Sequence, residues 1–203
     1  QARVLWRRTA SIAPPIALML PAHNEASTVV ESVRSMLALD YPEFEVIVIN
    51  DGSSDDTLAT LRSAFALQRI VRSHDDILAH APIRAVYRSA IDERLIVIDK
   101  EHGGKADALN AGLNLARAPL VSAIDADSVL EPDALLRAAQ PFMDDPERVV
   151  AVGGTVRIAN GCDIRDGRVR AIGVAKNFWA RVQTIEYLRA FLLARLAWSQ
   201  FGA

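Results

Sequence analysis

The stretch IALML at residues 16–20 decides the fold class, because it is an apolar run without polar alternation. Such a run is typical of a strand that is covered on both faces, as in a parallel sheet. It ends at Pro21, and residues 26–39 then place apolar side chains at helical spacing. A buried strand followed by an amphipathic helix predicts the first unit of an α/β fold.

The alternation of strand and helix continues along the chain. Apolar runs predict further strands at 45–49, 94–99 and 120–124, each followed by a helix, and a glycine-containing run predicts another strand at 149–158. Residues 66–93 share no sustained hydrophobic period, so we expect a loop with some helix there. The pattern indicates an α/β fold with a mostly parallel central sheet and helices on both faces.

Residues 182–198 predict an amphipathic helix, with Ile185, Leu188, Leu192 and Leu196 along one face. An apolar stripe of this width suits a helix that packs on the core of its own domain. It equally suits a helix that lies at a membrane surface, so both interpretations stay open.

The composition indicates a single globular domain and excludes several classes of protein. The 203 residues are 51% hydrophobic and 24% charged, which is enough apolar material for one core. A formal net charge of -2 argues against nucleic acid as a partner. The single cysteine, Cys162, excludes an internal disulfide.

No apolar run reaches the ~18 to 20 residues of a membrane-spanning helix. Residues 1–15 are basic and contain Trp6, which suits the cytoplasmic flank of a membrane helix or a solvated tail.

Polar residues gather directly after four of the predicted strands. The carboxyl ends of parallel strands meet at one edge of a sheet, where α/β proteins bind their ligands. The sequence therefore predicts one site built from four clusters: PAHNE at 21–25, NDGS at 50–53, GGK at 103–105 and DAD at 125–127.

Asp125 and Asp127 are separated by one residue at the end of a predicted strand. Two such carboxylates can reach the same divalent cation, and their hard oxygen atoms favour Mg²⁺ or Mn²⁺. For an isolated pair, a solvated turn in which Asp127 caps the next helix is the simpler explanation.

Gly103, Gly104 and Lys105 combine turn residues, backbone N–H groups at a helix start and one cation, which together suit a phosphate. The spacing of a P-loop is absent, and a tight turn with an exposed lysine is the alternative. Asp51 could accept hydrogen bonds from a ribose or a base, or belong to a capping turn. The histidines show no regular ligand spacing, and we expect His102 at the surface.

Taken in order, three stretches resemble motifs of the family 2 glycosyltransferases, which have the GT-A fold: LPAHNE, VINDGSSDDT and KEHGGKADALNAGLNLARAPLVSAIDADS. The resemblance spans residues 16–198, and it is nearest to membrane-embedded processive β-glycosyltransferases such as poly-N-acetylglucosamine, hyaluronan, chitin and cellulose synthases. It implies a GT-A domain at 16–203 that transfers a sugar, with inversion, from a UDP-sugar to a growing polysaccharide or another acceptor hydroxyl.

The resemblance also implies a role for individual residues. The segment from Pro21 to Glu25 and Asp51 would hold the uridine, and Lys105 would face the pyrophosphate. Asp125 would lie against the ribose and the metal, and Asp127 would be the principal ligand of Mg²⁺ or Mn²⁺. The nucleotide-sugar site implied in this way consists of Pro21, Ala22, His23, Glu25, Asp51, Gly52, Gly104, Lys105, Asp125 and Asp127.

The acceptor side of that reaction has no counterpart in the sequence. Inverting members of the family use a further carboxylate as general base, in a Thr-Glu-Asp-like or Glu-Asp motif, and processive members add Gln-x-x-Arg-Trp. Neither motif occurs here, so we expect the general base beyond Ala203, in a longer parent protein at the cytoplasmic face of the cell membrane. The alternatives are a non-catalytic nucleotide-sugar-binding or partner-binding module, a non-processive transferase to a lipid carrier, and a sugar-nucleotide pyrophosphorylase.

Overall fold

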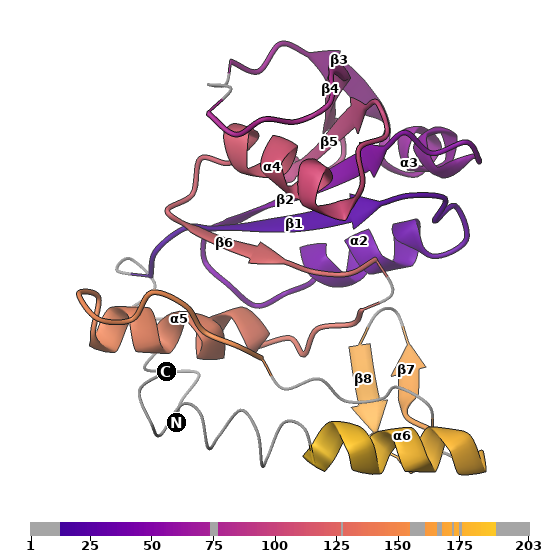
Figure 1. Cartoon of the computed structure of the whole chain (residues 1–203), viewed down its shortest axis with the longest axis vertical. Coiled ribbons are helices and arrows are strands. Elements are labelled where there is room, and N and C mark those ends of the chain that lie inside the picture. Colours follow the sequence, from indigo (N-terminus) through magenta and orange to yellow (C-terminus); the bar gives the residue numbers. More distant parts are fainter. Residues whose placement is uncertain are drawn as a thin grey trace.

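The computed structural model describes residues 13–73, 77–126, 128–154, 161–165, 168–171, 173–174 and 176–189. Six strands form one mixed sheet in the order β3-β4-β5-β2-β1-β6 (Figure 1). The four strands from β5 to β6 in that order run parallel, whereas β4 pairs antiparallel with β5, and β3 with β4. The strands are β1 (Ile16–Ala22), β2 (Phe44–Asp51), β3 (Leu67–Ile70), β4 (Ile83–Ser89), β5 (Leu95–Lys100) and β6 (Leu120–Ala123).

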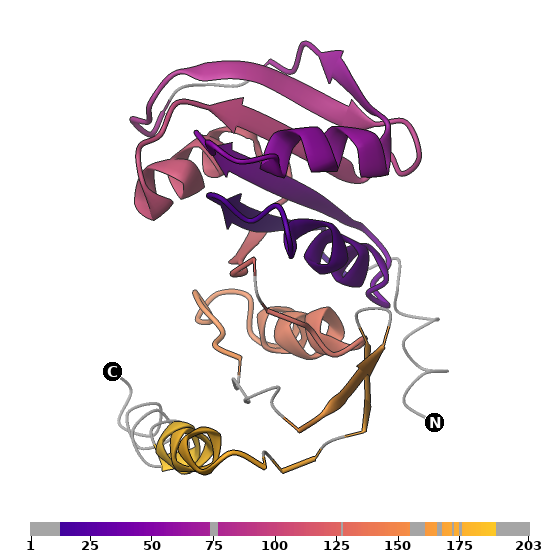
Figure 2. The same cartoon turned by 90° about the vertical axis from the view of Figure 1, so that its right-hand side faces the viewer.

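Helices cover both faces of the sheet, as the sequence predicts (Figures 1 and 2). One core lies under α2, α3 and α5, and the other lies under α4. The helices are α2 (Val29–Leu37), α3 (Thr57–Phe65), α4 (Lys105–Leu115) and α5 (Ala134–Asp144).

Alternate side chains of the central strands enter the two cores. In β2, Val46 and Val48 belong to the core under α2 and α3, while Ile47 and Ile49 belong to the core under α4. All four are fully buried, which explains why the strand shows no polar alternation. The predicted mostly parallel α/β architecture is therefore confirmed.

The prediction of a loop with some helix at 66–93 is wrong, because this segment contains β3 and β4. The two strands form the antiparallel edge of the sheet, and Gln68, Arg69, Arg84 and Arg88 on them are exposed. Charged residues are common on edge strands, where they oppose pairing with other chains. They interrupt the apolar period by which the central strands are recognised.

The strand predicted at 149–158 is absent from its described part, since residues 149–154 have no regular secondary structure. Val150 is 92% exposed and has no sheet to pack against, and Gly153 and Gly154 disfavour an extended ladder. Residues 155–158 lie outside the described part of the chain.

The last described helix, α6 (Phe178–Arg189), begins before the amphipathic helix predicted at 182–198. Ile185, predicted on the apolar face of that helix, is 64% exposed. A separate hairpin of β7 (Asp163–Arg165) and β8 (Arg168–Ala171) precedes it.

Residues 190–198, and residues 1–12 of the predicted basic segment, lie outside the described part. Among the described residues, no helix has the length and apolar character needed to cross a bilayer.

Candidate functional site

The candidate site lies where the central parallel strands end. The register aligns Ala22 of β1 with Asn50 of β2, and Asp51 of β2 with Lys100 of β5. A pocket of about 450 Å³ opens at this edge, a size that suits a small-molecule ligand. Residues from all four predicted clusters line it: Pro21, Ala22, His23, Glu25, Asp51, His102, Gly104, Lys105, Ala108, Asp125 and Ala126.

Asn24 joins the first two clusters. Its φ of 59° is a left-handed conformation that Asn tolerates, and it turns the chain after β1. Its side-chain oxygen accepts hydrogen bonds from the backbone N–H groups of Ser54 and Asp55, at 2.8 and 3.3 Å, and its own N–H donates to Ser53 Oγ at 3.0 Å. The serines therefore bond to the PAHNE segment, and the Asp55 carboxylate accepts the N–H of Thr57 at the start of α3.

The carboxylate of Asp51 is buried and surrounded by N–H donors. Its Oδ1 accepts hydrogen bonds from Lys100 Nζ at 2.7 Å and Gly103 N at 3.0 Å. Its Oδ2 accepts one from Gly104 N at 2.8 Å and lies 3.0 Å from Nδ1 of His102. The two glycine N–H groups, which we expected to face a phosphate, thus point at Asp51, because a buried carboxylate without partners is unfavourable.

The partners of Asp51 also set its pKa. Burial alone raises the pKa of this carboxyl group, but hydrogen bonds from Lys100, Gly104 and Gly103 outweigh burial and hold the pKa below its ordinary value. Asp51 is therefore ionised in the folded protein at neutral pH.

We expect the free energy of unfolding to fall as the pH drops below about 4, the pKa of an aspartate in an unfolded chain. A carboxyl group whose folded pKa is lowered stabilises the fold above its unfolded pKa, and this stabilisation disappears as the pH falls through the folded pKa. Urea denaturation of the wild type and of Asp51→Asn at pH 7, 5, 4 and 3 would test this prediction. The stability difference between the two proteins should shrink toward pH 3. A difference that stays constant over this range would contradict the prediction.

Lys100 is a site residue that the sequence reasoning did not single out. Its side chain is 0% exposed, and its ammonium group contacts Asp51, the carboxylate of Asp107 and the carbonyl oxygen of Glu101. A signal was present in the sequence, because the period of two in β5 places Lys100 on the same face as the buried Ile98.

Two imidazole rings flank the backbone of Asp51. The ring centroids of His23 and His102 lie 4.5 Å apart, and their Nδ1 atoms lie 2.8 and 3.1 Å from the Asp51 carbonyl oxygen. A carbonyl oxygen only accepts, so both Nδ1 atoms carry a proton. His102 is exposed as predicted, at 60% of its side chain, and it also lines the pocket.

His23, Asp51 and His102 present possible ligand atoms within 4.8 Å of one another. A metal bound there through the Asp51 carboxylate would have to displace at least one of its present donors, Lys100, Gly103 or Gly104. The present hydrogen bonds therefore oppose a cation at this position.

Asp125 also lines the pocket, where it forms an ion pair with Lys105. Their side chains are 58% and 60% exposed, so the pair contributes about 1 kcal/mol or less and can exchange partners easily. Ser32 of α2 donates to the carbonyl oxygen of Ala126 and ties the DAD turn to that helix. Asp127 lies outside the described part of the chain.

Glu25 and Gly52 support the site from its borders. The Glu25 carboxylate accepts a hydrogen bond from Thr28 Oγ1 at 2.7 Å, at the start of α2. Gly52 does not line the pocket, but its φ of 61° and its close approach to the His102 backbone leave no room for a side chain. A Cβ at this position would lie 2.6 Å from the His102 nitrogen.

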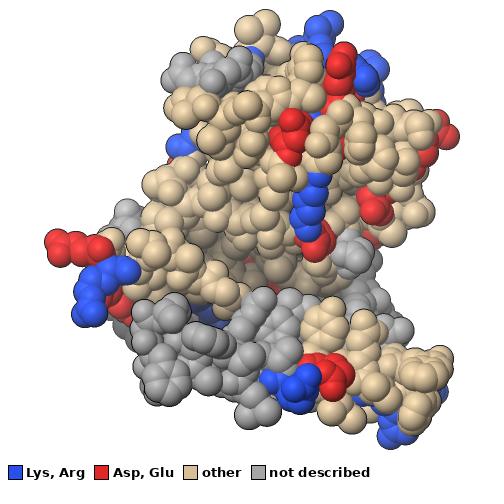
Figure 3. Space-filling view, in the orientation of Figure 1, with Lys and Arg blue, Asp and Glu red and all other residues tan. Residues whose placement is uncertain are grey.

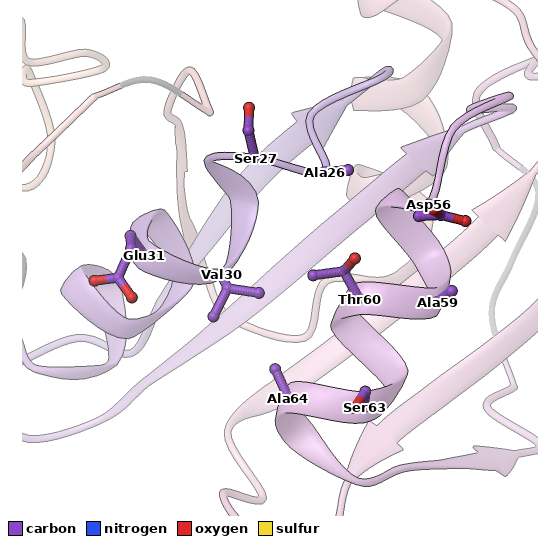
Figure 4. A pocket seen from close by; sticks show the side chains of 9 residues that line it. All are labelled: Ala26, Ser27, Val30, Glu31, Asp56, Ala59, Thr60, Ser63 and Ala64. Carbon is purple, nitrogen blue, oxygen red and sulfur yellow. The ribbon is translucent and has the colours of Figure 1, made fainter.

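A second hollow, of about 620 Å³, lies between α2 and α3 (Figure 4). Small side chains such as Ala26, Thr60 and Ser63 line it, with the carboxylates of Glu31 and Asp56 at its border. The described members of the predicted nucleotide-sugar site are not among its lining residues. On the face shown in Figure 3, the described charged side chains of both signs are interspersed, without a basic patch for a polyanion.

Fold and site together define an α/β domain with a polar ligand site at the carboxyl edge of a mostly parallel sheet. The family model described as "Glycosyl transferase family 2" matches residues 18–195. The chain therefore belongs to glycosyl transferase family 2.

The chain is similar to poly-beta-1,6-N-acetyl-D-glucosamine synthases. That of Staphylococcus epidermidis is 32% identical over 173 residues, and that of Staphylococcus aureus strain COL is 30% identical over the same length. In both cases the match covers 85% of this chain and 32% of the relative. The chain thus spans about a third of the length of these relatives.

Two solved structures also resemble the chain. One is the mannosyltransferase PcManGT from Pyrobaculum calidifontis in complex with GDP-Man and Mn²⁺, with 24% identity, a TM-score of 0.49, and coverage of 71% of this chain and 41% of that chain. The other is S. aureus TarS 1-349, with 19% identity, a TM-score of 0.48, and coverage of 77% and 43%.

Proposed function

We propose that this chain is the donor-binding part of an inverting glycosyltransferase that moves a sugar from a UDP-sugar to a growing polysaccharide or another acceptor hydroxyl. The observation that carries the proposal is the pocket at the carboxyl edge of the sheet, which gathers all four polar clusters. Family membership supports glycosyl transfer as the reaction. Similarity to poly-beta-1,6-N-acetyl-D-glucosamine synthases supports a polysaccharide as the product.

Lys105 is the residue that we assign to the diphosphate of the donor. It begins α4, where the partial positive charge of the helix start also favours an anion. Its ion pair with Asp125 is exposed, so Lys105 can exchange a carboxylate oxygen for a phosphate oxygen at little cost. Pro21, Ala22 and His23 line the same pocket and are assigned to the nucleoside.

A divalent cation, Mg²⁺ or Mn²⁺, fits the residues that follow β6. The carboxylate of Asp125 is exposed and already attracts the Lys105 ammonium group, and carboxylate oxygens are ligands that these cations prefer. We assign Asp127, two residues further on, as the principal ligand. When bound, the cation would supply positive charge opposite the departing diphosphate.

The acceptor half of the reaction is assigned to the parent protein. In this proposal the general base that takes the acceptor proton lies outside residues 1–203, and the parent protein works at the cytoplasmic face of the cell membrane. The length of the synthase relatives, about three times the matched segment, is compatible with such further parts.

Titration calorimetry with UDP tests the proposal. We expect one UDP per chain in the presence of MnCl2, with binding weakened about tenfold or more by Asp127→Ala or by EDTA, which is at least ~1.4 kcal/mol. Arg34→Ala, which removes an exposed ion pair with Glu31 on α2, serves as control and should bind like the wild type. Absence of UDP binding, or binding that Asp127→Ala and EDTA leave unchanged, would refute the proposal.

A further inference from the structure

Lys100 is a buried cation that cannot reach a ligand itself. An ammonium group has three N–H donors, and three acceptors surround this one: Asp51 Oδ1 at 2.7 Å, the Glu101 carbonyl oxygen at 2.6 Å and the carboxylate of Asp107. The side chain is 0% exposed, and lysine is almost never buried completely unless it is paired. Any effect of Lys100 on a ligand must therefore pass through its partners.

The two carboxylates around Lys100 hold the two sides of one turn. Asp51 ends β2 and accepts the N–H groups of Gly103 and Gly104. Asp107 lies in the first turn of α4, just beyond that glycine pair, and also accepts the backbone N–H of Ala81 at 2.8 Å. The ammonium group thus links the end of β2, the end of β5 and the start of α4.

The turn between these carboxylates is tightly packed. A Cβ at Gly103 would lie 2.3 Å from the carboxyl group of Asp107, so this carboxyl group packs directly against the glycine turn. Gly104 has a φ of 90°, and Lys105 follows it directly at the start of α4. The position of Lys105 therefore depends on how Asp51 and Asp107 are held.

We infer that Lys100 is a positioning residue of the donor site, which neutralises Asp51 and Asp107 so that the Gly103–Gly104 turn presents Lys105 to the pocket. The inference rests on the proposed donor site. Without the ammonium group, the buried Asp51 carboxylate and the partly exposed Asp107 carboxylate would face each other, and like charges placed in this way repel. The turn would then open, because movement of α4 or of the turn is the way to separate them.

The electrostatics of Asp107 agree with this role. The hydrogen bond from Lys100 is the largest cause that holds the pKa of Asp107 below its ordinary value, whereas the negative charge of Asp51 acts to raise it. The two carboxylates therefore already influence each other in the presence of Lys100.

Charge balance distinguishes positioning from a general contribution to stability. Lys100→Met keeps an unbranched apolar side chain but removes the cation. The double variant Lys100→Met/Asp107→Asn also removes one negative charge, so that Asp51 is the single carboxylate left around position 100. If the cation acts by neutralising both carboxylates, the second substitution should repair the damage of the first.

The experiment measures UDP affinity in MnCl2 by calorimetry, urea stability, and amide hydrogen exchange of Gly103 and Gly104 by NMR. We expect Lys100→Met to weaken UDP binding about tenfold or more and to speed exchange at both glycines. The double variant should recover at least half of the lost binding free energy and restore protection. Lys176→Met, at an exposed lysine, is the matched control and should behave like the wild type.

Two results would overturn the inference: UDP affinity and glycine exchange unchanged in a folded Lys100→Met, or no recovery in the double variant. If Lys100→Met does not fold, Lys100→Gln replaces it in the same comparison, and absence of recovery again counts against the inference. The glycine exchange rates do not depend on a ligand. A wild type that fails to bind UDP while the exchange rates behave as expected would therefore refute the donor site and leave the Lys100 effect on the turn intact.

Discussion

Asp51→Ala is expected to lower the free energy of unfolding by about 3–5 kcal/mol, the range for removing one partner of a buried ion pair. The side chains of Lys100 and Asp51 are 0% and 4% exposed, so water cannot replace the missing carboxylate. The substitution also leaves the N–H groups of Gly103 and Gly104 without their acceptor. Each buried donor left unsatisfied is unfavourable by itself.

Urea denaturation at pH 7 would measure this loss, with Asp92→Ala as the matched control. Asp92 also bonds a cation and a backbone N–H, both from Arg94, but the side chains of that pair are 25% and 38% exposed. The control should therefore lose about 1 kcal/mol or less. Equal losses of unfolding free energy in the two variants would mean that burial does not strengthen the interactions of Asp51.

The centre of the fold could be predicted from sequence because its strands are buried on both faces. Val46 to Ile49 alternate between two cores, so every position is apolar and the run stands out. The antiparallel strands β3 and β4 could not be predicted in this way. Arg84 and Arg88 on β4 are exposed, and their pairing with β5 depends on a long-range register that no local period encodes.

The candidate site could be predicted to the level of clusters, but not to the level of hydrogen bonds. The sequence of the glycine pair at 103–104 does not show whether its N–H groups face a phosphate or a carboxylate. The choice depends on the register that sets Asp51 beside Lys100, which brings a buried carboxylate within reach of the turn. Such a register is a property of the assembled sheet.

The site has a fixed interior and an exchangeable border. Asp51 and Lys100 are buried and hold each other through a short contact, whereas Lys105 and Asp125 are more than half exposed. An anionic ligand can compete with the exposed pair, because that pair is weak in water. It cannot compete with the buried pair without unfolding the turn. The border is therefore where we place the diphosphate.

Gly52→Ala is expected to cause roughly twice the stability loss of Gly104→Ala and to weaken UDP binding as well. Both glycines have a positive φ, 61° and 90°, and such backbone strain is unfavourable for alanine by about 1–3 kcal/mol. Only at Gly52 does the new Cβ also meet backbone, 2.6 Å from the His102 nitrogen. Overpacking of this kind adds about 1–3 kcal/mol.

Gly104→Ala is the matched control, because its Cβ would have nothing within 4 Å. Urea denaturation of both variants compares a positive-φ position that has room for a Cβ with one that has none. Calorimetry with UDP and MnCl2 then follows the consequence for the site, since relief of the clash must move His102 and with it the turn that begins at Gly103. Equal stability losses would show that the His102 backbone moves aside freely. Asp51 accepts hydrogen bonds from Gly103 and Gly104 in that same turn. A backbone that moves freely at His102 would therefore also contradict our assignment of Asp51 and Lys100 as a rigid part of the site.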